Sequence, residues 1–519
     1  MTSINQRDIF SFSPKLPPYI HIPDCQELDA MELPISYQSS PLDQTMPPIY
    51  YAIILAFPVQ LAHREYALTA LQNGYSRLLQ ERPYLAGDIV RLDSPGVRPG
   101  SLKLTVPNPL PSIKLDVADL SESPEFKGYS YPSMCKAGMP PSLLNAELLA
   151  PYVGGPANTT KVLTGRVNWI EGGCLLAISA SHAALDAQGT FMVMKSWAQL
   201  CQPEVSPEIR SCPHSQRWKT EVKTAGGRLM IQGTASSQKP YEGLKSRPEL
   251  WNLLGLHSED NLAPPTASLP TCIPGAPGEV PGVRNCLFCF SVQDAAALKA
   301  AATPQASRGW ISTQDACSAH IWTSLMRARF PDHDISVSNG RLNEDSDEPL
   351  SSMNVAIDGR RIPGYHFAPS RINNTIYCCQ PQLPLSMILE RDNLPLIAGT
   401  IRQKIEAVKS DQDLINDANA LAAAIPNVGN LTFVFKDFMG IDFVTTSWTD
   451  LPYYDLDFGP GLGKPDFFRM PRNQFTGACC MLPRRPNGDI EVVVSGRVEE
   501  IGRLLKDTNF LKYAKFVGG

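Results

Sequence analysis

Apolar residues along this chain fall into short runs that alternate with segments of helical periodicity, the pattern of an α/β protein. The runs Ile49–Phe57, Val162–Ile170 and Cys174–Ile178 predict buried strands in the first part of the chain. A Glu-Gly-Gly turn separates the last two, so they should pair as a hairpin. Arg64–Gln80 repeats apolar residues at helical spacing and predicts a helix before Pro83.

The second part of the chain repeats this alternation. Thr313 is the expected N-cap of its clearest helix. Strands are predicted over Asn285–Val292, Met353–Ile357, Leu431–Lys436, Asp442–Ser447 and Glu491–Arg497, and helices over Gln293–Ala302, Ser312–Phe330, Pro395–Asp411 and Asp413–Ile425.

Residues 204–282 differ from the rest because Pro, Ser and Gly are frequent there. We interpret them as a long crossover between an N-terminal α/β domain (1–203) and a C-terminal α/β domain (283–519). Helices are predicted over Gln216–Gln232 and Pro248–Leu256. The alternative is a disordered linker, but the apolar cluster Leu250, Trp251, Leu253 and Leu254 indicates that part of the segment packs on a core.

Composition excludes several classes of protein. The chain has 519 residues, 43% of them hydrophobic, and a formal net charge of −5 without a basic stripe, so nucleic acid is not an expected partner. No apolar run of about 18 residues predicts a membrane span, and no signal sequence is seen, so a cytoplasmic protein is expected. The thirteen cysteines are expected to be reduced, and no metal site is predicted, because Cys286 and Cys289 lack a second ligand pair.

The clearest chemical signal is His182, which directly follows the second strand of the predicted hairpin, with Asp186 four residues further on. A strand end can aim a side chain precisely, and an imidazole with an ordinary pKa of about 6.5 can accept a proton near neutral pH. A carboxylate at a strand–helix junction usually binds a cation or a backbone N–H group. A histidine and an aspartate at this spacing also occur by chance, so the motif alone leaves a structural role open.

Further motifs occur in a fixed order around this pair. They are Pro41-Leu42-Asp43-Gln44, Pro83-Tyr84-Leu85-Ala86-Gly87, Ile311–Trp322, Asp358-Gly359-Arg360, Thr446-Ser447-Trp448 and Asp457-Phe458-Gly459. Together with His182 and Asp186, they make the chain resemble the BAHD acyltransferases, in particular the fungal members. The resemblance covers most of the chain.

The resemblance implies two similar α/β sandwich domains of the chloramphenicol acetyltransferase type, with a channel between them, in a monomeric enzyme. It implies an acyl-CoA co-substrate, with acetyl-CoA as the first choice, no permanently bound cofactor, and a small hydrophobic acceptor with a hydroxyl group. His182 would be the general base, and Asp186 would pair with Arg360. Thr446 and Trp448 would line the oxyanion or substrate site, and Asp457, Phe458 and Gly459 would form a structural loop.

The chain departs from the family pattern at three places, one of which is the Tyr-x-Gly-Asn element that usually follows Arg360 and is not clear around Tyr365–Ser370. Ala187 follows Asp186 where the family commonly has glycine, and the loop after Gly459 lacks the usual tryptophan and is longer. No Gly-x-Ser-x-Gly nucleophile motif occurs, which fits direct acyl transfer without a covalent enzyme intermediate. Two alternatives remain open: a condensation, cyclisation or isomerisation that uses the same base without acyl transfer, and a small-molecule binding protein without catalytic activity.

Overall fold

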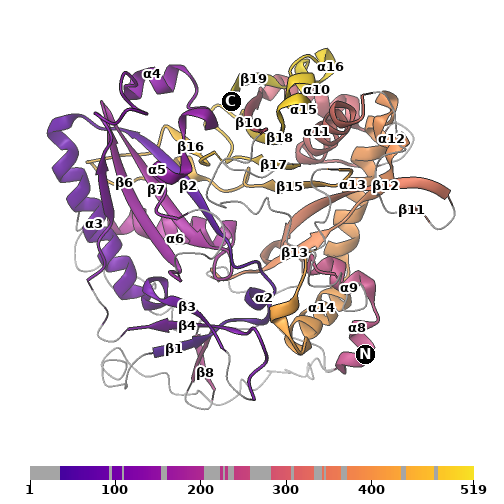
Figure 1. The fold of residues 1–519 in the computed structure, drawn as a ribbon, viewed down its shortest axis with the longest axis horizontal. Coiled ribbons are helices and arrows are strands. Elements are labelled where there is room, and N and C mark those ends of the chain that lie inside the picture. The colour runs from indigo at the N-terminus through magenta and orange to yellow at the C-terminus, as the bar shows by residue number, and fades with distance from the viewer. Residues whose placement is uncertain are drawn as a thin grey trace, which may run out of the picture.

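The computed structural model describes residues 35–92, 96–107, 110, 112–152, 160–203, 222–225, 228–231, 239–257, 282–304, 309–331, 342–343, 346–363, 371–433, 440–472 and 477–519. Two α/β lobes lie side by side (Figure 1). We call residues up to 203 the N-terminal half and residues 282–519 the C-terminal half.

The N-terminal half is built on a five-stranded sheet with the order β16-β2-β7-β6-β5. The predicted hairpin is confirmed, because β6 (Leu163–Ile170) and β7 (Gly173–Ser181) pair in antiparallel fashion, and β2 (Tyr50–Pro58) pairs with the other edge of β7. The edge strands are β5 (Asp116–Asp119) and β16 (Phe467–Arg469). Strand β16 comes from late in the chain, so the C-terminal half completes the sheet of the N-terminal half.

Two helices cover this sheet, and the first of them confirms the helix predicted over Arg64–Gln80. They are α3 (Arg64–Glu81) and α6 (Ala187–Leu200), whose apolar faces pack together. The indole of Trp197 on α6 is fully buried and donates to the carbonyl of Leu71 on α3 at 3.0 Å. This contact fixes α6, and therefore the loop that precedes it, against the rest of the N-terminal half.

A second five-stranded sheet overturns one prediction. Its order is β3-β4-β1-β9-β8, and β8 (Val222–Ala225) and β9 (Arg228–Ile231) lie where a helix was predicted over Gln216–Gln232. That prediction is wrong for these residues. A Gly-Gly pair interrupts the helical pattern, and β9 gains a parallel partner in β1 (Ile35–Gln38), a pairing that local periodicity cannot reveal. The other strands are β3 (Asp88–Arg91) and β4 (Leu102–Val106).

The C-terminal half contains a nine-stranded sheet with the path β11-β12-β15-β17-β18-β10-β19, and β13 and β14 pair with β12. Its strands are β10 (Val283–Phe290), β11 (Leu342–Asn343), β12 (Ser346–Asp358), β13 (Ile376–Cys379), β14 (Gln382–Pro384), β15 (Phe443–Ser447), β17 (Ala478–Met481), β18 (Ile490–Arg497) and β19 (Lys515–Gly518). Of the strand predicted over Leu431–Lys436, residues 434–436 lie outside the described residues, and Phe433 forms an isolated bridge with Leu256.

Four predicted helices of this half are confirmed: α10 (Val292–Ala302), α11 (Thr313–Arg329), α13 (Leu394–Ser410) and α14 (Gln412–Ala424). The N-cap of α11 is Ser312 rather than Thr313, because Ser312 and Asp315 form a reciprocal capping box. In both halves and the crossover, the other α-helices among the described residues are α2 (Pro41–Gln44), α4 (Tyr131–Lys136), α5 (Ala146–Leu149), α8 (Tyr241–Lys245), α9 (Pro248–Leu253), α12 (Leu385–Leu389), α15 (Val498–Leu504) and α16 (Thr508–Leu511).

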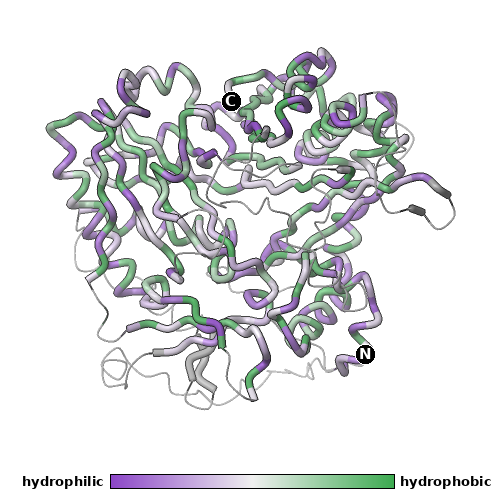
Figure 2. The backbone as a smooth tube through the Cα atoms, in the orientation of Figure 1, coloured by the Kyte–Doolittle hydropathy of each residue, from purple (hydrophilic) through white to green (hydrophobic). Residues whose placement is uncertain are grey.

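Apolar residues concentrate in the strands and the inner helix faces of both halves, as the green stretches of Figure 2 show. The cluster predicted to pack in the crossover does so. Leu250, Trp251, Leu253 and Leu254 are all buried in the core of the C-terminal half. None of the described helices combines the length and apolar character that a bilayer crossing requires.

Candidate active site

His182 occupies the first position after β7, where the backbone is held on both sides. Its N–H donates to the carbonyl of Ile49 at 2.8 Å, and its own carbonyl accepts from the side-chain amide of Asn374 at 2.8 Å. Strand β7 is buried along its whole length, so the residue after it starts from a rigid element. The backbone of His182 is therefore fixed by both halves of the chain.

The imidazole of His182 is half-buried and has one accessible nitrogen. Its Nδ1 is buried and makes no hydrogen bond to any described residue, so Nε2 is the nitrogen left open to a ligand. The ring packs edge-on against Tyr51 with a centroid distance of 5.5 Å, and Tyr51 packs edge-on against Trp448 at 6.0 Å. The Tyr51 hydroxyl is tied to the hydroxyl of Thr190 at 2.6 Å. His182 thus sits in an aromatic setting formed by both halves.

Burial lowers the pKa of His182 below its ordinary value of 6.5. Its own backbone carbonyl, the negative charges of Asp186 and Asp43 and the amide of Asn374 oppose this effect without cancelling it. The imidazole is therefore neutral at pH 7, which is the state that accepts a proton.

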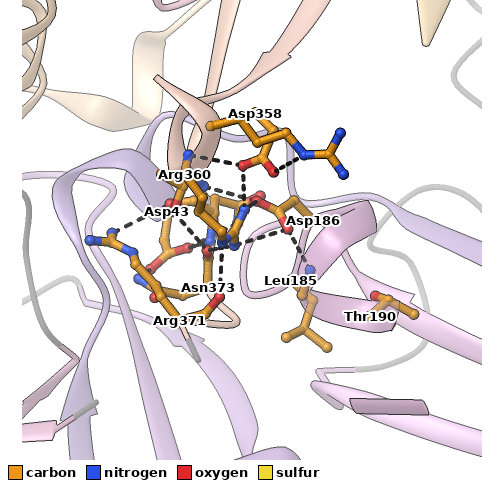
Figure 3. A network of polar contacts seen from close by, with 12 residues as sticks. Asp43, Leu185, Asp186, Thr190, Asp358, Arg360, Arg371 and Asn373 are labelled. Carbon is orange, nitrogen blue, oxygen red and sulfur yellow. Dashed lines mark hydrogen bonds and ion pairs between the residues drawn. The ribbon is translucent and has the colours of Figure 1, made fainter. Parts of the chain in front are cut away.

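Asp186 is the N-cap of α6, and its carboxylate makes no hydrogen bond to the His182 imidazole among the described residues. Its Oδ1 accepts from the backbone N–H of Gly189 at 2.7 Å, and its Oδ2 accepts from the N–H of Thr375 at 2.9 Å. Arg360 donates to both oxygens at 3.0 and 3.2 Å (Figure 3). The predicted pair of Asp186 and Arg360 is thus present in the structure, and all four contacts hold the loop rather than the imidazole.

Arg360 also donates hydrogen bonds to the segment 371–375 of its own half. Its Nε donates to the carbonyl of Arg371 at 2.9 Å, and one terminal nitrogen donates to the carbonyl of Asn373 at 2.7 Å. The side chain is almost fully buried, at 6% exposure, and also pairs with Asp358 at 3.0 Å. One guanidinium therefore joins the loop after His182 to a loop far away in the sequence.

Asp43 of the N-terminal half also binds segment 371–375. The sequence did not predict the partners of this carboxylate. It is 1% exposed and accepts from Ser40 within its own turn. It also accepts from the side chain of Asn373 at 3.1 Å and from the backbone and side chain of Asn374, both at 2.9 Å. The motif around Asp43 was noticed, but no local pattern identifies a partner more than 300 residues away.

Gly189 offers a direct test of how closely α6 approaches segment 371–375. A Cβ atom at this position would lie 1.8 Å from the carbonyl oxygen of Ile372. We therefore expect Gly189→Ala to lower the free energy of unfolding by about 1–3 kcal/mol, the usual cost of overpacking. Gly243→Ala is the control, because a Cβ there meets nothing within 4 Å and alanine favours a helix. Equal urea midpoints for the two variants would contradict the close approach.

Thr446 and Trp448 lie at the end of β15, on the side of the sheet that faces the N-terminal half. Thr445 points into the core of the C-terminal half at 1% exposure, so Thr446 points the other way and is half-buried. Trp448 packs in the core cluster of the N-terminal half. The ring of Tyr51 contacts both Trp448 and His182, so Trp448 lies near the imidazole with one aromatic side chain between them.

The predicted structural loop lies away from His182, near the C-terminal end of α6. It consists of Asp457, Phe458 and Gly459. Phe458 packs edge-on against Phe57 and Trp197, with centroid distances of 5.4 and 6.2 Å. Asp457 caps the turn by accepting from the N–H of Gly459 at 2.9 Å, and Gly459 has a φ of +87°. His182 precedes the opposite end of this helix, which is 14 residues, or about 20 Å, long. These contacts are those of a structural loop.

Comparison with known proteins decides the family. A model described as "Trichothecene 3-O-acetyltransferase-like N-terminal domain" matches residues 49–201, and the "Transferase family" model matches residues 289–511. Eremophilane O-acetyltransferase ORF8 of Penicillium roqueforti is 33% identical over 92% of this chain and 98% of its own length. Eremophilane O-acetyltransferase prx11 of Penicillium rubens is 34% identical over 92% and 97%.

The chain belongs to the BAHD acyltransferases. The fold agrees with this membership. The structure of TRI101 from F. sporotrichioides, solved with coenzyme A and T-2, matches with a TM-score of 0.72 at 23% identity, over 94% of this chain and all of that one. The predicted fold class is thereby confirmed. The chain is an acyltransferase, which argues against the alternative of a small-molecule binding protein without catalytic activity.

Proposed function

We propose that the chain transfers an acetyl group from acetyl-CoA to a hydroxyl group of a small apolar terpenoid of the eremophilane type. The observation that carries this proposal is the similarity, over nearly the whole length of both chains, to two eremophilane O-acetyltransferases. The structure of TRI101 with coenzyme A and T-2 supports a CoA thioester as the donor. The aromatic surroundings of His182 suit an apolar acceptor better than a charged one.

In this proposal His182 is the general base. Its Nε2 takes the proton from the acceptor hydroxyl while the oxygen attacks the thioester carbonyl. The tetrahedral intermediate then collapses, the C–S bond breaks, and the protonated Nε2 returns the proton to the departing thiolate. Thr446 and Trp448 carry an O–H and an N–H group that can donate to the oxyanion. Asp186 and Arg360 do not contact the reacting atoms in this proposal. They hold the backbone of the loop between His182 and α6.

The proposal is tested by incubating the purified chain with acetyl-CoA and a panel of hydroxylated eremophilanes. We expect free CoA and a product heavier by one acetyl group, both dependent on the alcohol. Conversion of an alcohol to an isomer of unchanged mass, without consumption of acetyl-CoA, would favour the alternative of base-catalysed isomerisation or cyclisation.

The pH dependence of the reaction provides a further prediction. His182 must be neutral to act as a base, and burial lowers its pKa below 6.5. We therefore expect the acid limb of kcat/KM to have its midpoint below pH 6.5, with most of the activity present at pH 7. A midpoint clearly above pH 7 would contradict the assignment of this imidazole as the base.

A further inference from the structure

Two hydrogen bonds hold the backbone of His182, and both lead back to the short segment 43–49. The N–H of His182 donates directly to the carbonyl of Ile49. The carbonyl of His182 accepts from the side-chain Nδ2 of Asn374 at 2.8 Å. The same Nδ2, and the backbone N–H of Asn374, donate to the carboxylate of Asp43, both at 2.9 Å. Asp43 and Ile49 therefore hold the two sides of one peptide unit, the first of them through Asn374.

The segment 43–49 is stiff between these two contacts. Pro47 and Pro48 lie directly before Ile49, and each proline ring fixes its own backbone φ. The N–H of Ile49 donates to the carbonyl of Pro47 at 2.8 Å and closes a tight turn. The segment therefore keeps a fixed spacing between its contact to Asn374 and its contact to His182.

The carboxylate of Asp43 is fixed in turn by donors from both halves. It is 1% exposed, and its Oδ2 accepts from the hydroxyl of Ser40 at 2.6 Å and from the N–H of Ser40 at 3.0 Å. The same oxygen accepts from the side chain of Asn373 at 3.1 Å (Figure 3). Leu42, the residue before, is fully buried in the core cluster of the C-terminal half. A rotation of this carboxylate would leave several buried donors without a partner, so its orientation is strongly favoured.

We propose that Asp43 is a positioning residue for His182 that acts through Asn374. Asp43 makes no hydrogen bond to His182 among the described residues. Its carboxylate orients the carboxamide of Asn374, and this carboxamide fixes the carbonyl side of the His182 backbone. Because Asn374 belongs to the C-terminal half, the base is in place only when the two halves are packed together. This inference rests on the proposed role of His182 as the base.

Gln44 supplies a matched control. It is the next residue of α2, it is also buried, and its side chain makes two hydrogen bonds of 2.7 Å, to the N–H and the carbonyl of Leu102. These bonds lead to β4 and not to His182. We therefore expect Gln44→Ala to lower the melting temperature, while the folded enzyme keeps its kcat.

The test begins with Asp43→Asn, which keeps the size of the side chain but replaces one acceptor oxygen with a donor. The donors of Ser40, Asn373 and Asn374 can then no longer all be paired. We expect kcat for acetyl transfer to fall about 10²-fold, the cost of a misplaced reacting group, with KM for acetyl-CoA and for the alcohol little changed.

A double variant tests whether Asp43 acts through Asn374. Asn374→Ala removes the same link, so it should lower kcat to a similar level, and the double variant Asp43→Asn, Asn374→Ala should be no slower than either single variant. Losses of kcat that multiply in the double variant would overturn the inference. An unchanged kcat in folded Asp43→Asn would overturn it as well.

Hydrogen–deuterium exchange measured by mass spectrometry gives a readout that requires no acetyl transfer. In Asp43→Asn we expect faster exchange in the peptides that contain residues 182–186 and 371–375, and wild-type exchange in the same peptides of Gln44→Ala. Exchange that is faster throughout the chain in both variants would show a purely structural role and overturn the inference.

Ser40→Ala is the substitute if Asp43→Asn does not fold. It keeps the charge of Asp43 and removes only the hydrogen bond of 2.6 Å, so a smaller fall of kcat and the same local increase in exchange are expected. No change in either quantity would count against the inference. A chain that shows the expected exchange but transfers no acetyl group would contradict the proposed function and leave the link from Asp43 to His182 intact.

Discussion

Replacing His182 with alanine should lower kcat for acetyl transfer about 10²–10⁴-fold, the range that a general base usually contributes. The fold should survive this change, because the hydrogen bonds that fix the residue run through its backbone N–H and carbonyl groups, which alanine keeps. The measurement is steady-state kinetics with acetyl-CoA and an eremophilane alcohol, together with thermal unfolding of both proteins.

His320 is the matched control for this experiment. It is a buried histidine in α11 that stacks on Phe510 with a centroid distance of 5.4 Å, and burial lowers its pKa to about 4. We expect His320→Ala to lower the melting temperature while the folded enzyme keeps its kcat. Loss of activity in both variants in proportion to unfolding would show that the effect of His182→Ala is structural.

Replacing Asp186 with alanine should lower the free energy of unfolding by about 3–5 kcal/mol, because it leaves a buried guanidinium without its main partner. The carboxylate is 1% exposed and accepts from Gly189, Thr375 and Arg360. The same change removes the N-cap of α6 and releases the loop that carries His182, so kcat should fall as well. Urea unfolding and kinetics on the same preparation measure both effects.

Arg360 and Arg361 allow the ion pair to be separated from a general loss of positive charge. Arg361 is the next residue, its side chain is 47% exposed, and it contacts Asp358 and Asp450 at the surface. Arg361→Met should change stability by less than about 1 kcal/mol, as is usual for exposed pairs, whereas Arg360→Met should be severe. The double variant Asp186→Ala, Arg360→Met should lose less than the sum of the single losses. Additive losses would contradict a coupled pair.

Much of the N-terminal half could be predicted from its sequence, since its strands are continuous apolar runs and its helices carry one apolar face. The hairpin of β6 and β7 follows from two such runs joined by a glycine turn. The position of His182 after β7 follows from the same pattern. Local hydrophobic periodicity was enough in these cases because the structure that it predicts is itself local.

The segment 371–375 could not be predicted in this way. Its residues, Arg-Ile-Asn-Asn-Thr, show no helical or strand period, and their hydrogen bonds go to Asp43 and Asp186 in the other half of the chain. Nothing in the spacing of a polar segment reveals an acceptor that lies so far away. The same reason explains the strand pairing of β9 with β1, and of β16 with β2. Apart from the pair of Asp186 and Arg360, which the family resemblance implied, the junction of the two halves is therefore known only from the structure.

The central claim is that acetyl passes directly from CoA to the acceptor with His182 as the base. Intact-protein mass spectrometry after incubation with acetyl-CoA, first without and then with an eremophilane alcohol, tests it most directly. Direct transfer predicts an unmodified protein in both samples, and free CoA with an acetylated product only in the second. A protein that gains one acetyl group before any alcohol is added, and passes it on when the alcohol arrives, would contradict the account.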